Sequence, residues 1–122
     1  MGAFRRRWPG LSYGRGEDWH IVGAVGEPAF QNSWTAESGY MTPGFRIREA
    51  GVVDIYGKFK SGSSGTVAFT LPVGYRPNAD VLIVGDSGYL AIGSNGNVTV
   101  LTSGTKLIVS GQFFLDVPDN AP

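Results

Sequence analysis

The sequence predicts an all-β domain of about eight short antiparallel strands, arranged as a β-sandwich with a jelly-roll-like order. Two observations lead to this class. The 122 residues include 19 Gly and 7 Pro, and the longest stretch free of both, residues 29–38, is shorter than an average helix. Between these breaks, Val, Ile, Thr and aromatic residues alternate with polar ones, which is typical of half-buried strands. An orthogonal barrel is the alternative arrangement.

The predicted strands cover most of the chain. They span residues 29–35, 44–48, 52–60, 66–71, 80–84, 89–92, 97–101 and 106–115. Because side chains along a strand alternate between its two faces, each run has a predicted core side. In the first, third and fourth runs the predicted core residues are Phe30, Trp34, Val53, Ile55, Gly57, Phe59, Val67, Phe69 and Leu71.

One segment is expected to form hydrogen bonds to the backbone of a sheet edge, and another is expected to end a strand and turn the chain. In the first run, Gln31 and Asn32 offer amide groups to the backbone of a sheet edge. After the fourth run, Pro72 ends the strand because Pro cannot continue a hydrogen-bonded ladder. Residues 74–77 (GYRP) then turn the chain toward the next strand.

Two further segments predict turns between strands. Residues 94–97 (SNGN) predict a type I′ hairpin turn, which needs positive φ at both central residues, Asn95 and Gly96. Residues 62–65 (GSSG) predict a flexible loop that joins a second hairpin.

The last run, residues 106–115, is apolar on both faces. Leu107 and Phe113 lie on one face, and Ile108 and Phe114 lie on the other. A strand of this kind is usually central and covered on both sides, by a second sheet or by another subunit. We therefore expect the protein to associate with itself.

The first eighteen residues lack alternation and are expected to form an extended basic arm, so that residues 19–122 make up the β domain. Residues 1–16 carry four Arg and no acid, whereas residues 17–122 carry six Lys or Arg and ten acidic residues. Guanidinium groups pair with carboxylates, and aromatic side chains are rarely left in a free tail. The predicted attachment residues of the arm are Phe4, Arg5, Arg6, Arg7, Trp8, Leu11, Tyr13 and Arg15.

Composition excludes several classes of function. The chain has no Cys, which excludes disulfide frameworks, thiolate metal sites and Cys nucleophiles. Its formal net charge of zero argues against a nucleic-acid partner, and no apolar run is long enough to span a membrane or to form a secretory signal.

The sequence gives no sign of a catalytic centre. The single His, His20, is expected to pack structurally, and no acidic cluster at ligand spacing surrounds it. Acidic residues such as Asp54, Asp80 and Asp86 fall on outward faces or at strand ends. We expect no catalytic residue, metal site or cofactor, and no enzymatic activity. The remaining candidates, as glycan or interface contacts, are Tyr40, Tyr56, Tyr89 and Phe114.

An ordered set of motifs resembles a known module. Residues 26–34 (GEPAFQNSW), 51–53 (GVV), 69–77 (FTLPVGYRP) and 93–98 (GSNGNV) follow in the order found in the C-terminal module of bacteriophage tail fibre and minor tail proteins, particularly of phages of actinobacteria. The resemblance covers about residues 19–116. The residues that it marks as fold-determining are Phe30, Trp34, Phe45, Val53, Phe69, Pro72, Gly74, Tyr75, Pro77, Asn95 and Gly96.

The resemblance implies a β-sandwich displayed on a virion, commonly as a trimer, whose loops can contact a host surface. We therefore expect a small, freestanding structural protein made in the cytoplasm of the host bacterium. It would be bound through its arm to tail or capsid proteins and displayed on the virion surface. A minor tail or tail-fibre-like component, with a host-surface glycan as a further candidate partner, is favoured over a capsid decoration protein (head fibre). A cellular carbohydrate-binding sandwich is the third alternative.

Overall fold

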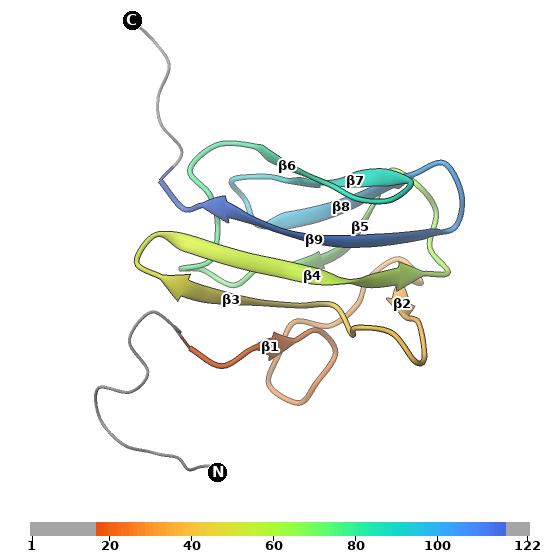
Figure 1. Cartoon of the computed structure of the whole chain (residues 1–122), viewed down its shortest axis with the longest axis horizontal. Coiled ribbons are helices and arrows are strands. Elements are labelled where there is room, and N and C mark those ends of the chain that lie inside the picture. Colours follow the sequence, from red (N-terminus) through yellow and green to blue (C-terminus); the bar gives the residue numbers. More distant parts are fainter. Residues whose placement is uncertain (1–16, 117–122) are drawn as a thin grey trace, which may run out of the picture.

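The computed structural model describes residues 17–116, which form nine β-strands in two antiparallel sheets and contain no helix (Figure 1). Sheet A comprises β1 (His20–Ile21), β2 (Thr35–Ala36), β3 (Gly44–Glu49), β4 (Val52–Lys60) and β9 (Lys106–Phe114). Sheet B comprises β5 (Thr66–Thr70), β6 (Val81–Val84), β7 (Gly88–Ile92) and β8 (Asn97–Thr102). The prediction of an all-β, antiparallel domain is confirmed for this part of the chain.

Strand β4 is the centre of sheet A. It pairs with β9 along its whole length, from Val52 opposite Phe114 to Lys60 opposite Lys106. Its other edge pairs first with β3 and then with the short strand β2. Sheet B has the order β5-β8-β7-β6. The consecutive strands β6, β7 and β8 form a meander, and β5, which precedes them in the chain, pairs with β8, as in a Greek key.

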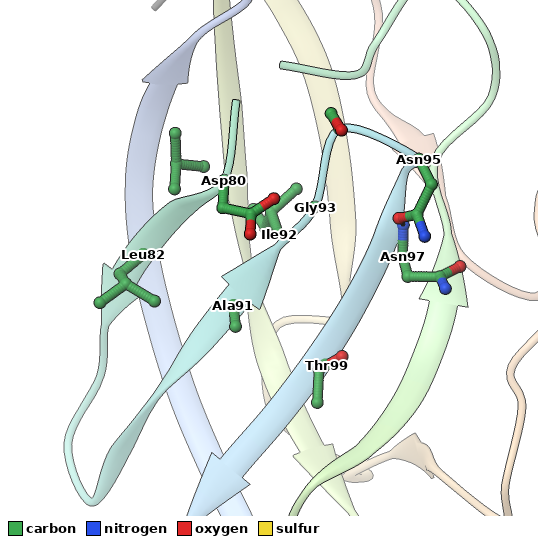
Figure 2. A pocket seen from close by; sticks show the side chains of 10 residues that line it. Asp80, Leu82, Ala91, Ile92, Gly93, Asn95, Asn97 and Thr99 are labelled. Carbon is green, nitrogen blue, oxygen red and sulfur yellow. Dashed lines mark hydrogen bonds between the residues drawn. The ribbon is translucent and has the colours of Figure 1, made fainter. Parts of the chain in front are cut away.

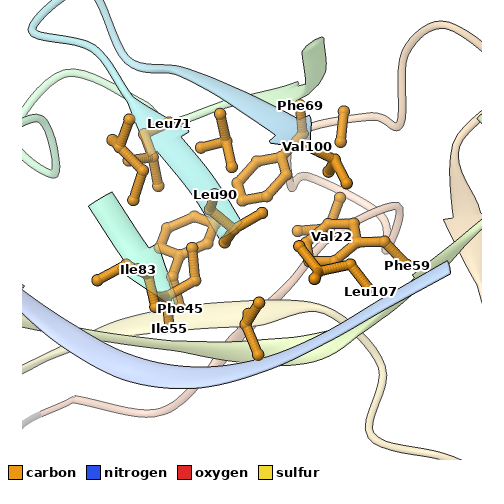
Figure 3. Close-up of a cluster of buried hydrophobic side chains, with 14 of the residues drawn as sticks. Val22, Phe45, Ile55, Phe59, Phe69, Leu71, Ile83, Leu90, Val100 and Leu107 are labelled. Atoms are coloured by element: carbon orange, nitrogen blue, oxygen red, sulfur yellow. The ribbon is translucent and has the colours of Figure 1, made fainter. Parts of the chain in front are cut away.

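The hydrophobic core lies between the two sheets (Figure 3). Phe69 of sheet B stacks between Phe45 and Phe59 of sheet A, with ring centroids 5.9 and 6.2 Å apart. Trp34 is 1% exposed, and its Nε1 donates a hydrogen bond to Thr66 Oγ1 at 2.9 Å. Of the residues that the resemblance marks, those buried here are Trp34, Phe45, Val53, Phe69, Pro77 and Gly96.

The prediction of a strand at residues 29–35 is wrong, because only Thr35, at the end of this range, belongs to a strand. Asn32 and Ser33 have φ of 55° and 68°, which is left-handed backbone that no pleated strand contains. The expected amide contact does form, since Asn32 Nδ2 donates to Val67 O at 2.8 Å. Phe30 and Trp34 still pack against the core, but a turn rather than a strand face brings them there.

The predicted alternation of the fourth run is also wrong at one position. The pairing of β5 with β8 shifts between Val67 and Phe69, which indicates a β-bulge. As a result Ala68 and Phe69 are both buried, and Val67 lies half-exposed instead of in the core.

The last strand does not take the predicted central position. β9 lies at the edge of sheet A, and beyond β4 its pairing is a single bridge between Val109 and Gly85. This bridge connects β9 with the end of β6 in sheet B. Ile108 on its outer face is half-buried, whereas Phe114 is 53% exposed.

Three local features also differ from the predictions. The turn after β7 has positive φ at Gly96 and not at Asn95, and Gly96 N donates to Gly93 O at 2.9 Å. It is therefore a three-residue hairpin loop with a Gly bulge, not a type I′ turn. The loop at 62–65 connects β4 with β5 in the other sheet, so no hairpin forms there. Strand β1 was not predicted, because two residues are too few to show alternation.

Candidate functional site

A concave region of about 410 Å³ lies on the outer face of sheet B (Figure 2). Asp80 and Leu82 line it from the start of β6, and Ala91 from β7. The turn that follows β7 and the first residues of β8 complete it. Its polar side chains are Asp80, Ser94, Asn95, Asn97 and Thr99.

The two Asn side chains are held in fixed orientations by hydrogen bonds. Asn95 Oδ1 accepts from the backbone N of Asn97 at 3.0 Å, and Asn97 Oδ1 accepts from Thr70 Oγ1 at 3.0 Å. Both carboxamide oxygens are therefore engaged. Within residues 17–116, the amino groups of these two side chains, the Asp80 carboxylate and the Thr99 hydroxyl make no hydrogen bond or ion pair with the protein.

Gly93 leaves the centre of this region open. A Cβ at this position would lie 2.8 Å from Asn95 Oδ1 and 3.6 Å from Asp80 Oδ1. Figure 2 shows Asp80 and Asn95 on either side of Gly93. The absence of a side chain therefore keeps these two polar groups accessible from the same space.

The two outer faces of the molecule differ in charge. The outward residues of β6, β7 and β8 are uncharged, and two of them, Leu82 and Val84, are 61% and 76% exposed. On the outer face of sheet A, by contrast, Asp54 lies 3.4 Å from Arg46 and 3.0 Å from Arg48, and Lys58 and Lys60 follow along β4. Sheet A thus carries a charged, paired surface, whereas the outward residues of β6, β7 and β8 in sheet B carry no charge.

The structure separates the four candidate glycan or interface residues. Tyr56 stacks on Trp19 with ring centroids 4.3 Å apart, and the guanidinium of Arg46 lies 4.5 Å above the Trp19 ring. Tyr40 is exposed, but Lys58 Nζ lies 3.7 Å from its ring centroid.

The other two candidates are more accessible. Tyr89 lies on the uncharged outer face of sheet B, and Phe114 lies at the end of β9 on the opposite sheet. The four candidates therefore do not form one site.

A second polar cluster surrounds His20. Its Nδ1 lies 2.9 Å from Glu27 Oε2, and its Nε2 lies 2.9 Å from the Tyr75 hydroxyl and 3.3 Å from Glu17 Oε2. Tyr75 donates to Glu17 Oε1 at 2.8 Å. Two carboxylates, Glu17 and Glu27, therefore contact His20, and their spacing in the sequence did not indicate either contact. The expected packing role is compatible with the stacking of His20 on Phe45 at 5.2 Å.

The cluster does not resemble a metal site. The carboxylates lie on opposite sides of the imidazole, and among residues 17–116 no three His, Cys, Asp or Glu side chains are grouped to hold an ion. The same part of the chain contains no helix that could cross a membrane.

The remaining predicted residues fall into two groups. Gly74 has a φ of 100° in a turn closed by the hydrogen bond from Tyr75 N to Pro72 O. The positive φ at the third residue of this turn favours Gly at position 74. The arm residues Phe4, Arg5, Arg6, Arg7, Trp8, Leu11, Tyr13 and Arg15 lie outside the described residues. Glu17, which was counted with the arm, is bound to the body, because its backbone N donates to Ile47 O at 3.1 Å.

Sequence reasoning missed most of the concave region. The sequence indicates Asp80 only as a residue at a strand end, and Asn95 and Asn97 only as part of a turn; it assigns no role to Thr99. The outward position of Thr99 beside the SNGN turn was the only available signal, since the other groups come from separate segments. No model of a protein family matches the chain, and no curated protein is significantly similar to it.

Proposed function

We propose that this chain is a non-catalytic structural protein of a bacteriophage virion, which associates with its own copies through the apolar end of the outer face of sheet B, around Val84 and Tyr89. In this proposal the two sheets form a β-sandwich of jelly-roll-like order, as in the phage tail modules that the sequence resembles. The residues that carry the resemblance support it in one respect: Trp34, Phe45, Val53 and Phe69 are core residues, as fold-determining residues should be.

The observation that carries the proposal is the uncharged, apolar part of the outer face of sheet B around Val84. Val84 projects from β6, and Tyr89 from β7 lies opposite it in register. Leu101 of β8 lies opposite Tyr89. A contiguous apolar surface without charges is typical of the centre of a subunit interface, and it is unfavourable to expose to water. We assign it to a contact between copies of this chain, with a trimer as the expected state.

Attachment to the particle is assigned to residues 1–18. The four Arg of residues 1–16 would bind acidic surfaces of neighbouring virion proteins, while the remainder of the chain carries an excess of acidic residues. A position in the tail, with the body facing the host, is preferred. Decoration of the capsid is the alternative, and the number of copies per virion separates the two, because a capsid offers many equivalent positions.

The mass of the protein in solution tests self-association. Light scattering at micromolar concentration should give three times the 13.0 kDa chain mass. Val84→Asp places a charge on the apolar face at an exposed position, so the fold should persist and the mass should fall to that of one chain. Ser110→Asp adds the same charge to the exposed outer face of sheet A and should leave the mass unchanged. A wild-type monomer would contradict the proposed interface.

Virion association tests the arm. Purified particles should retain the full chain but not a variant that lacks residues 2–16 and keeps Glu17 with its contacts to the body. Binding of the full chain should weaken as salt rises, because exposed charges are screened. Equal retention of both proteins would exclude the arm as the attachment device.

A further inference from the structure

We propose that the concave region around Asp80, Asn95, Asn97 and Thr99 is a binding site for a neutral carbohydrate, which it recognises through neighbouring hydroxyl groups. The inference concerns the end of sheet B near Asp80. The proposed subunit contact lies at the opposite end of the same face, around Val84 and Tyr89, and neither of these residues lines the concave region. The two proposals therefore stand independently.

The polar groups match the hydrogen-bonding capacity of a sugar. Each sugar hydroxyl donates one hydrogen bond and accepts others, so two adjacent hydroxyls are best met by a bidentate acceptor beside a donor. The carboxylate of Asp80 supplies the acceptor, and hydrogen bonds to a charged acceptor are the stronger ones. The amino groups of Asn95 and Asn97 supply donors, and the Thr99 hydroxyl can do either.

The fixed orientation of the Asn side chains favours binding. The bonds from Asn97 N and from Thr70 Oγ1 occupy the two carboxamide oxygens, so each amino group has a defined direction. A ligand that uses these donors then need not order them first, which reduces the entropic cost of association. Gly93 provides the space between Asp80 and Asn95 in which a ring hydroxyl would lie.

Apolar side chains complete the site. Leu82 and Ala91 lie opposite each other in the pairing of β6 with β7, and both line the region. Together they present C–H groups to the less polar face of a pyranose ring. A concave, partly apolar surface with a few directed polar groups is the usual form of a small-molecule site.

The charge of the region selects the class of ligand. Asp80 is the one ionisable residue among the described residues that line it. Its carboxylate would repel phosphorylated or carboxylated sugars, because no cation in this described lining offsets it. A single carboxylate is also a poor cation site, since calcium in proteins takes six to eight oxygen ligands. A neutral hexose or hexoside fits these constraints.

Nuclear magnetic resonance of the ¹⁵N-labelled full chain tests the proposal. Three ligands are titrated to about 50 mM, a range suited to millimolar affinity: methyl β-D-glucopyranoside, methyl α-D-mannopyranoside and methyl β-D-galactopyranoside. At least one should cause saturable shifts at the amides of residues 93–99. Glucose 6-phosphate serves as the charged comparison and should bind at least tenfold more weakly than the best glycoside.

Two variants and one control make the result specific. Asp80→Asn keeps the side-chain shape but loses the charged acceptor, and should weaken binding about tenfold. Gly93→Ala fills the space between Asp80 and Asn95 and should abolish the shifts. Asp18→Asn removes an exposed carboxylate outside the region and should leave the affinity unchanged.

The proposal is overturned if none of the three glycosides shifts residues 93–99, if Asp80→Asn binds as well as the wild type, or if glucose 6-phosphate binds equally well. A response to calcium chloride in place of the glycosides would identify a cation site and would also overturn it. Failure here would leave the solution mass and the virion association untouched. Conversely, a monomer that bound a glycoside would contradict only the subunit contact.

Discussion

His20 Nε2 lies 2.9 Å from the hydroxyl oxygen of Tyr75, although 55 residues separate them in the chain. The two rings meet edge to face with centroids 5.2 Å apart, and both pack against Phe45 of the core. Glu27 is hydrogen-bonded to His20 Nδ1, and Glu17 accepts a hydrogen bond from the Tyr75 hydroxyl. The cluster therefore joins the first described residues to the segment between β5 and β6.

The geometry favours a charged imidazole. The Tyr75 hydroxyl donates a hydrogen bond to Glu17. The hydroxyl oxygen of Tyr75 can therefore only accept the hydrogen bond from His20 Nε2. With Nδ1 donating to Glu27, both ring nitrogens carry protons. Burial disfavours the charged form, but the hydrogen bonds to Glu27 and Glu17 outweigh it and raise the pKa of His20 above 6.5. Burial and the neighbouring Glu17 raise the pKa of Tyr75 to about 12.

The first prediction is a loss of stability at mildly alkaline pH. Because the pKa of His20 is higher in the folded state, its stabilisation is complete below the unfolded pKa of about 6.5 and is lost as pH rises through the folded pKa. We expect the free energy of unfolding to fall by about 1 kcal/mol or less between about pH 6 and pH 8.5, since the pair is partly exposed. Urea unfolding at a series of pH values measures it.

His20→Gln is the control for this prediction. It should be less stable than the wild type at about pH 6 and should lack the decrease toward about pH 8.5. Glu17 acts in the opposite direction. Burial raises its pKa, but hydrogen bonds from Ile47 N, Tyr75 and His20 lower it on balance, so its stabilisation is lost as pH falls. An unchanged alkaline slope in His20→Gln would show that another group titrates.

The second prediction concerns Gly57 in the middle of β4. It is buried with a φ of 143°, and a Cβ there would overlap the backbone of Pro43. Gly57→Ala should therefore cost about 3 kcal/mol or more of unfolding free energy, because backbone must move and φ is unsuited to Ala. Gly104→Ala has open space around it and should change stability by less than about 0.5 kcal/mol. Equal midpoints in urea would disprove the close contact.

Alternation in the sequence located the long strands well. β4 and β9 carry apolar residues or Gly at every second position, and this pattern survives in the structure as a buried inner face. It failed at residues 29–34, where the contact between Asn32 and Val67 O accompanies a left-handed turn. A contact between segments 35 residues apart leaves no local signal. The prediction of a central last strand failed for a related reason, since the bridge from Val109 to Gly85 is also non-local.

The concave region was even less accessible to sequence reasoning. Asp80 looked like a residue at a strand end, and its neighbours Asn95 and Thr99 belong to another hairpin. Their proximity depends on the pairing of β6 with β7 and of β7 with β8. The residues that line the region follow no regular spacing in the sequence, so a single sequence does not reveal that they lie together.

The third prediction separates the two contributions of Asn32. Its φ of 55° favours Asn or Gly, and its amide donates to Val67 O. Asn32→Gly keeps the backbone geometry and loses the hydrogen bond, so it should cost about 1 kcal/mol. Asn32→Ala loses both and should cost about 2 kcal/mol or more. Equal unfolding midpoints for the two variants would show that left-handed backbone strain contributes nothing at this position.

The last prediction concerns Asp86, which links the end of β6 to the outer edge of β9. Asp86 Oδ1 accepts from Ile108 N at 2.9 Å, while Asp86 N donates to Ile108 O at 3.1 Å. The Ile108 N–H points away from β4 and would otherwise meet solvent. Asp86→Ala should therefore accelerate hydrogen exchange at Ile108 selectively, whereas the β9 amides that bond to β4 serve as internal controls and should keep their protection.

The pH dependence of the same amide provides a second test. The hydrogen bond from Ile108 N is the main cause that lowers the pKa of Asp86, so the contact is strongest above the usual carboxyl pKa of about 3.8 and weakens as pH falls through the lowered value. Asp86→Asn keeps an acceptor oxygen without the charge, and it should retain part of the protection with no such acid dependence. Unchanged exchange at Ile108 in Asp86→Ala would mean that the Asp86 carboxylate does not protect this amide.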